Sequence, residues 1–275
     1  MKPAAFDYLA PETLKEALAA LAEAGEDGRV LAGGQSLVAM LNMRLARPRL
    51  LVDITRLAEL GEIEERRDVI RIGAAVRQAT LENLPDLAKT LPLVARAMPW
   101  VGHEQLRSRG TVCGSLAHAD PSAELPLCLI ALDGSVTLKR GRKSRTIPAA
   151  ELFVGMMFTA VSPGEMIVSV DFPKREKGAG YAFHEVARRG GDFAIVACAA
   201  IARPDGTARL AVGGVADTPQ VLDLPADGTD RNDRINDFAW TLGARDDLHA
   251  TARYRRMLVR HLGRATLEEA MSCRA

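Results

Sequence analysis

A loop of glycine and small polar residues near position 33 has the composition needed to hold a phosphate group. A short strand-like stretch at 29–32 runs into Gly33 and Gly34, and Ser36 follows at the head of a helix-like stretch. Glycine permits a left-handed backbone and close approach of a ligand, while serine often caps helices. Free amides at a helix start attract anions. The loop predicts a phosphate or pyrophosphate site, although it is neither a Walker loop nor a G-x-G-x-x-G fingerprint. A tight turn without a ligand is the alternative.

Two further segments combine glycines with hydrogen-bonding side chains. Residues 109–121 are rich in small residues, and Gly110 and Gly114 flank a short strand-like piece. Hydroxyls and closely spaced amides of this kind form anion-binding nests, so we expect a second anion site here. A polar surface loop before a helix is the alternative. Residues 187–194 lie between two predicted strands and, taken alone, indicate a hairpin turn.

Other chemistries find less support in the sequence. The five histidines are scattered, and neither a G-x-S-x-G elbow nor an H-E-x-x-H pair is present. His118 and Asp120 form an acid–base candidate only through their proximity in sequence. None of the four cysteines belongs to a C-x-x-C pair. We therefore expect neither a metal site nor an iron–sulfur cluster within this chain.

Composition limits the classes of partner. The chain has 36 Lys and Arg against 35 Asp and Glu, and only 4% aromatic residues, so no nucleic-acid partner is expected. The basic run 139–145 reads as a solvated hairpin tip, with a docking patch for a partner protein as the alternative. The N-terminus lacks an apolar signal core, and no stretch is long enough to span a bilayer. These features predict a cytoplasmic protein with reduced thiols.

The elements that must position these loops fall into three segments, 1–56, 57–174 and 175–275. The first reads as a small strand–helix–strand unit, with helices at 11–24 and 35–45 and strands at 29–32 and 50–54. The second mixes strands at 62–65, 69–72, 136–138 and 166–172 with helices at 77–84, 86–97 and 123–132. The third begins after a charged, glycine-ended linker. It reads as a three-stranded antiparallel meander at 180–185, 194–203 and 207–213, followed by helices at 231–240 and 248–270.

Together the loops resemble the FAD-binding medium subunits of the xanthine dehydrogenase and carbon monoxide dehydrogenase group of molybdenum hydroxylases. Residues 32–37 match the family's A-G-G-Q-S-L loop, and 101–121 resemble I-G-H-x-Q-I-R-N-R-G-T followed by [IV]-G-G-[NS]-L-A-H-A-D-P. Residues 187–194 are similar to A-R-R-x-G-D-[YF]-A, and 211–219 to L-G-G-V-x-x-T-P. The matches keep the family's order along the whole chain. Two residues differ from the family's motifs. Cys113 replaces a glycine, so a side chain here could reduce the room for the cofactor, and Phe193 stands where many members carry Tyr.

The resemblance implies an α+β fold in which two small subdomains, 1–56 and 57–174, clasp FAD in the vanillyl-alcohol-oxidase-like manner. A C-terminal domain of sheet and helices, 175–275, would follow. The first loop would hold the pyrophosphate and the second loop its other side, while Asp192 and Phe193 would lie near the isoalloxazine ring. The implied cofactor-binding residues are Ala32, Gly33, Gly34, Gln35, Ser36, Leu37, Val101, Thr111, Cys113, Gly114, Ser115, Asp120, Glu124, Ile167, His184, Asp192 and Phe193.

The implied function is electron relay through non-covalently bound FAD. The molybdenum cofactor and 2Fe-2S clusters would sit on a large and a small partner subunit, in a dimer of heterotrimers. No side chain would act as a nucleophile, since the flavin carries the redox chemistry. A free-standing FAD-dependent oxidoreductase and a flavin-binding module without electron transfer are the alternatives. The substrate and the electron acceptor (NAD, oxygen or a quinone) are left open.

Overall fold

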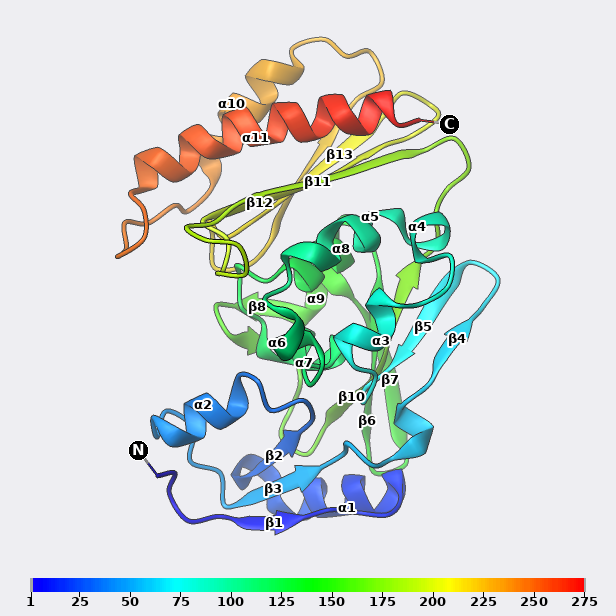
Figure 1. Ribbon diagram of the computed structural model, residues 1–275, viewed down its shortest axis with the longest axis vertical. Helices are drawn as coiled ribbons and strands as arrows, with labels where there is room; N and C mark the ends of the chain where they lie inside the picture. Colours follow the sequence, from blue (N-terminus) through cyan, green and yellow to red (C-terminus); the bar gives the residue numbers. More distant parts are fainter. Residues whose placement is uncertain (1, 275) are drawn as a thin grey trace.

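The structure is a computed structural model that describes residues 2–274. Three sheets follow one another along the long axis of the molecule, from the N-terminal strands at one end to the C-terminal helices at the other (Figure 1). Helices lie beside and between these sheets. The predicted α+β class is confirmed.

The first sheet has three parallel strands in the order β1-β3-β2. Its elements are β1 (Asp7–Leu9), α1 (Leu14–Ala24), η1 (Gly25–Asp27), β2 (Gly28–Leu31), α2 (Leu37–Asn42) and β3 (Leu50–Asp53), with η2 (Ala58–Leu60) after them. Thr13 starts α1 because its hydroxyl accepts a hydrogen bond from the amide of Glu16. The sequence did not predict β1, whose three exposed residues carry no apolar alternation.

The second sheet has five antiparallel strands in the order β4-β5-β10-β6-β7. These strands are β4 (Ile63–Glu65), β5 (Val69–Gly73), β6 (Ser135–Arg140), β7 (Lys143–Pro148) and β10 (Met166–Pro173). The predicted pairing of 62–65 with 69–72 is confirmed. The basic run does form a hairpin tip, since Arg140 pairs with Lys143 around the left-handed Gly141.

Short helices connect the strands of this sheet. They are α3 (Gln78–Glu82), α4 (Leu87–Thr90), α5 (Pro92–Ala97), η3 (Met98–Trp100), α6 (Glu104–Arg107), α7 (Val112–His118), α8 (Glu124–Ala131) and α9 (Ala149–Leu152), with the hairpin β8 (Phe153–Gly155) and β9 (Phe158–Thr159). Every residue of α8 is buried. It lies against the third sheet, on the side of the second sheet (Figure 1). A helix that is apolar all round needs such a position.

The third sheet is an antiparallel meander of four strands, β11 (Gly180–Val186), β12 (Val196–Ala202), β13 (Ala208–Gly213) and β14 (Gln220–Leu224). The sequence predicted only the first three. The fourth is an edge strand in which Leu224 alone is buried, so it lacks a clear apolar pattern. Helices α10 (Arg231–Thr241) and α11 (Ala252–Ser272) cover the outer face (Figure 1). None of the helices described in residues 2–274 has an apolar stretch long enough to cross a membrane.

Close packing of α11 on β11 leads to a stability prediction at Gly180. A β-carbon there would lie 1.9 Å from the carbonyl oxygen of Ala270, which is a backbone atom and cannot rotate away. We expect Gly180→Ala to lower the free energy of unfolding by about 1–3 kcal/mol, the usual cost of overpacking. Urea denaturation of the full chain measures this change.

Gly190→Ala is the matched control, because a β-carbon at Gly190 has no neighbour within 4 Å. We expect its denaturation midpoint to equal that of the unsubstituted chain. Equal midpoints for Gly180→Ala and Gly190→Ala would contradict the packing described for the third sheet.

Candidate functional site

The two glycine-containing segments open onto one large cavity of about 970 Å³. Its walls come from β2, α2, α7, the start of α8, the β8–β9 hairpin and the loop after β11. We call it the central cavity. Apart from His184, all the residues predicted to bind the cofactor line it. The structure therefore brings together three segments that are far apart in sequence.

In the first loop, main-chain amides are left without partners. Within residues 2–274, the amides of Gly33, Gly34, Gln35 and Ser36 donate to no carbonyl or side chain. Gly34 adopts φ +72°, which a residue with a side chain rarely adopts. Helix α2 begins only at Leu37, two residues later than predicted, and the Ser36 hydroxyl does not cap it. The predicted cap is wrong, and the free donors are main-chain groups.

The two glycine loops touch each other directly. A β-carbon on Gly33 would lie 2.3 Å from the carbonyl oxygen of Arg109 and 2.7 Å from the α-carbon of Gly110. Such distances are far below van der Waals contact, so any side chain at Gly33 must push the loops apart. Gly33 is therefore required for the meeting of the first two segments.

The second loop continues into helix α7, where the sequence predicted a strand-like piece. Thr111 caps this helix, and its hydroxyl accepts a hydrogen bond of 3.0 Å from the amide of Gly114. A β-carbon on Gly114 would lie 2.5 Å from that hydroxyl oxygen, so the cap itself requires glycine. The sequence did not predict this helix, because its small residues have low helix propensity and show no helical pattern of apolar residues.

The position of Cys113 explains how a cysteine can replace the glycine of the family pattern. It lies in the helical part of α7, with no left-handed backbone angle, and its side chain is only 3% exposed. The thiol points inward and donates to the carbonyl of Ile72 at 3.7 Å. Burial raises its pKa far above the usual range, so it is an inert core residue. A residue other than glycine therefore fits at this position.

Two acidic residues lie beyond α7 on the cavity wall. Ala119 ends the helix in a left-handed conformation, and Asp120 accepts a hydrogen bond from the amide of Ser122 at 2.9 Å. Glu124, the first residue of α8, is only 5% exposed. Burial raises the pKa of Glu124 to about 7, and the nearby charge of Asp120 adds to the effect. Asp120 and Glu124 thus carry the titratable acid groups of this wall.

The loop after β11 reaches the cavity from the third sheet. Gly191 has φ +84°, and a β-carbon there would lie 2.6 Å from the ring of His103. This contact places Asp192 and Phe193 at the cavity, where the Phe193 side chain is 63% exposed. Elsewhere Val101 and Ile167 contribute buried apolar surface. Phe193 offers an aromatic face without a hydroxyl.

His184 does not lie at this cavity. Its ring nitrogens contact Thr266 at 3.0 Å and Glu269 at 3.0 Å, both on α11. Side chains alternate across a strand, so His184 shares the outer face of β11 with Ala182, whereas Tyr181 and Phe183 face the inner core. The expectation for His184 is therefore corrected, because strand alternation directs it toward α11.

Gln78 is a cavity residue that the sequence reasoning missed. It is only 4% exposed, and its Oε1 atom has no hydrogen-bond partner among the described residues. The main-chain amide of Gln78 donates to the carbonyl of Gly110 at 2.8 Å, and this bond connects α3 to the second loop. No motif marks this position, because a lone glutamine at a helix start carries no spacing signal.

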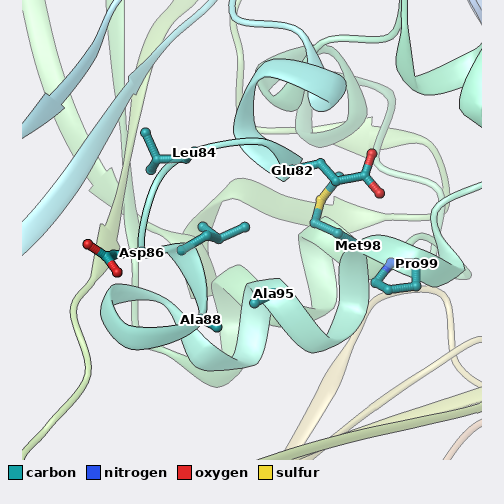
Figure 2. Close-up of a pocket in the computed structure, with 8 residues that line it drawn as sticks. Glu82, Leu84, Asp86, Ala88, Ala95, Met98 and Pro99 are labelled. Atoms are coloured by element: carbon teal, nitrogen blue, oxygen red, sulfur yellow. The ribbon is translucent and has the colours of Figure 1, made fainter.

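The structure provides no arrangement of residues for the other chemistries considered from the sequence. Across residues 2–274, no group of three His, Cys, Asp or Glu side chains is placed to hold a metal ion. A second cavity of about 320 Å³ lies among α3, α4 and α5 (Figure 2). Its Glu82 is held by Arg107 at 2.8 and 3.0 Å, and its Asp86 by Lys89 at 2.6 Å. Both carboxylates already have cationic partners, so this cavity is not the functional site.

A parallel sheet, a second sheet and two touching glycine loops around one cavity define a dinucleotide-binding protein. Residues 4–175 match a family model described as the FAD-binding domain in molybdopterin dehydrogenase. The chain is 39% identical to the 6-hydroxypseudooxynicotine dehydrogenase complex subunit alpha of Paenarthrobacter nicotinovorans, over 98% of this chain and 96% of that one. It is 36% identical to the carbon monoxide dehydrogenase medium chain of Hydrogenophaga pseudoflava, over 79% and 77%.

Solved structures agree with this relationship. A carbon monoxide dehydrogenase from Hydrogenophaga pseudoflava superposes with a TM-score of 0.92, at 31% identity and over 100% of both chains. Quinoline 2-oxidoreductase from Pseudomonas putida 86 gives a TM-score of 0.90, also at 31% identity, over 99% of each chain. The chain belongs to the family of FAD-binding medium subunits of molybdenum hydroxylases, and is a flavoprotein oxidoreductase subunit.

The cavity fits FAD in its chemistry. Unpartnered amides on the first loop suit the negative oxygens of a diphosphate. The unpartnered oxygen of Gln78 offers a buried acceptor for a donor on the cofactor. The volume falls at the upper end of the usual range for ligand sites.

The contact between the loops predicts the effect of a single methyl group. We expect Gly33→Ala to weaken FAD binding by about a hundredfold or more. A displaced loop loses at least two hydrogen bonds to a charged group, each contributing about 1.5 kcal/mol. Fluorescence titration of the apoprotein with FAD measures the change.

Gly243→Ala serves as the control, because a β-carbon there has no neighbour within 4 Å and lies outside the cavity lining. Circular dichroism checks that both variants are folded. Unchanged FAD affinity in a folded Gly33→Ala protein would show that the two loops do not form the diphosphate site.

Proposed function

We propose that this chain relays electrons within a molybdenum hydroxylase complex, using one non-covalently held FAD in the central cavity. The observation that carries the proposal is the meeting of two glycine loops at one wall of that cavity, the first of which has unpartnered amides. The bound flavin supplies the redox chemistry, because its ring accepts and releases electrons that amino-acid side chains cannot carry. The protein's own contribution is to place and shield that group.

Residue roles follow from position on the cavity wall. The amides of residues 32–36 hold the diphosphate from one side, and Thr111, Gly114 and Ser115 line the other side. The amides of residues 33–36 are without partners before the ligand arrives, so they require little reorganisation. Asp192 and Phe193 line the same cavity, and the exposed ring of Phe193 covers an aromatic face of the ligand.

Electrons reach the cavity from a partner chain in this proposal. Two relatives are named as subunits, the nicotine 6-hydroxylase medium subunit and the carbon monoxide dehydrogenase medium chain. By analogy, a small subunit with 2Fe-2S clusters delivers electrons, and a large subunit with the molybdenum cofactor oxidises the substrate. We propose a dimer of such heterotrimers in the cytoplasm, with the flavin passing electrons to an external acceptor.

A test of the relay uses the native complex purified through a tag on this chain. We expect FAD, iron and molybdenum to copurify. If the small subunit carries two 2Fe-2S clusters, about four irons should be found for each FAD. Acid precipitation should leave the yellow colour in the supernatant, because the flavin is not covalently attached. Addition of substrate should bleach the flavin bands.

The alternatives predict different results in the same measurements. A free-standing FAD-dependent oxidoreductase would copurify with FAD but with neither metal. A flavin-binding module without electron transfer would keep its flavin bands in the presence of substrate and partners. Either outcome would reject the relay.

A further inference from the structure

A buried carboxylic acid on β11 has no role in the site described so far. Glu185 is only 7% exposed, and it shares the inner face of β11 with Tyr181 and Phe183. That face packs against the core that contains α5 and α8. Glu185 therefore points toward the cavity-forming part of the molecule, whereas its neighbour His184 points toward α11.

The segment that leads into α8 is held against the third sheet close to this face. The amide of Gly214 donates to the carbonyl of Pro121 at 2.7 Å. A β-carbon on Gly213, which pairs with Ala197 opposite Glu185, would lie 3.2 Å from the same carbonyl oxygen. These contacts hold the segment that precedes Glu124 against β13, two strands away from Glu185 on β11. Glu124 is near enough for its charge to act on Glu185.

Within residues 2–274, Glu185 Oε2 has no hydrogen-bond partner, although the atom is fully buried. The groups around it offer no compensating charge. Its β12 neighbour is Ala197, and the one charge in the described part of the chain that shifts its pKa is that of Glu124. The titratable groups on the α8 side are Glu124 and Asp120, and both are acidic. A buried charge without a cationic partner is costly, so this site favours a proton.

The electrostatics agree with that geometry. Burial, together with the smaller effect of the negative charge of Glu124, raises the pKa of Glu185 to about 8. Burial likewise raises the pKa of Glu124 to about 7.

We propose that Glu124 and Glu185 form a carboxyl pair that keeps one proton at neutral pH, with Glu185 as a positioning residue behind the cofactor-facing Glu124. The proposal rests on FAD occupying the central cavity. The retained proton limits the pair to one negative charge beside a ligand that is itself anionic. Loss of that proton places a second negative charge near the cavity wall, without the gain of a cation to balance it.

The sign of the pH effect follows from the raised values. The folded chain keeps a proton that the unfolded chain has already released, so stability falls as pH rises from the ordinary glutamate value toward about 8. FAD binding should weaken in the same direction. We expect its dissociation constant to increase about threefold to tenfold between about pH 6 and about pH 9, since an interaction of one pKa unit corresponds to tenfold.

The experiment compares the full chain with Glu185→Gln and Glu185→Asp. Infrared spectra of the apoprotein should show a protonated-carboxyl band near neutral pH that disappears at alkaline pH. We expect Glu185→Gln to remove the more alkaline part of this titration, while Glu124 still titrates near pH 7, and to reduce the pH dependence of both apoprotein stability and FAD affinity. Glu185→Asp, which retains an acid, should keep a titrating band.

A purely structural role for Glu185 would shift stability equally at all pH values, and that result would overturn the proposal. So would an infrared titration that is the same in Glu185→Gln as in the unsubstituted chain. The apoprotein measurements separate this inference from the proposed function. A chain that ignores FAD at every pH defeats the cofactor assignment, while a missing carboxyl titration in a chain that binds FAD defeats the pair.

Discussion

The structure depends on one main-chain contact, in which Gly33 lies against the backbone of Arg109 and Gly110 without room for a methyl group. This contact sets the separation between the parallel sheet and the second sheet, and so the width of the cavity between the glycine loops. Gly110 is confined in turn, because a β-carbon there would lie 2.8 Å from the side-chain oxygen of Gln78. A diphosphate site needs amides at fixed positions, and a close backbone contact holds them more rigidly than flexible side chains would.

The third sheet supports the cavity that the first two units enclose. Arg255 of α11 is buried and donates to the carbonyls of Ile195 and Gly214, each at 2.6 Å. Gly214 in turn holds Pro121 in the segment before α8. Hydrogen bonds therefore link the outermost helix to the segment that leads into the acidic part of the cavity wall. Removing one partner from such a buried network leaves the other polar groups unpaired at a cost in free energy.

The two glycine loops could be predicted from the sequence, because their residue types act locally. Residues 32–37 and 111–115 combine glycines with small polar residues that few other structures require. The misses have physical causes. Helix α7 has too few long apolar residues to show a helical period, and β1 and β14 are edge strands with little buried surface. His184 was predicted to contact the cofactor from an alignment of positions along the chain. Such an alignment does not say which face of a strand a residue occupies, because side chains alternate between the two faces.

Cys113 and Gly114 show why a motif has to be read with backbone geometry. Both positions belong to the family's glycine pair, yet only Gly114 has a neighbour, the Thr111 hydroxyl, in the place of a β-carbon. Cys113 has a helical backbone and directs its side chain into the core, so a larger residue fits there. The tolerance of a glycine position therefore depends on where its missing β-carbon would point. The same rule distinguishes Glu185 from His184, since adjacent residues on one strand face a buried acid pair and an outer helix respectively.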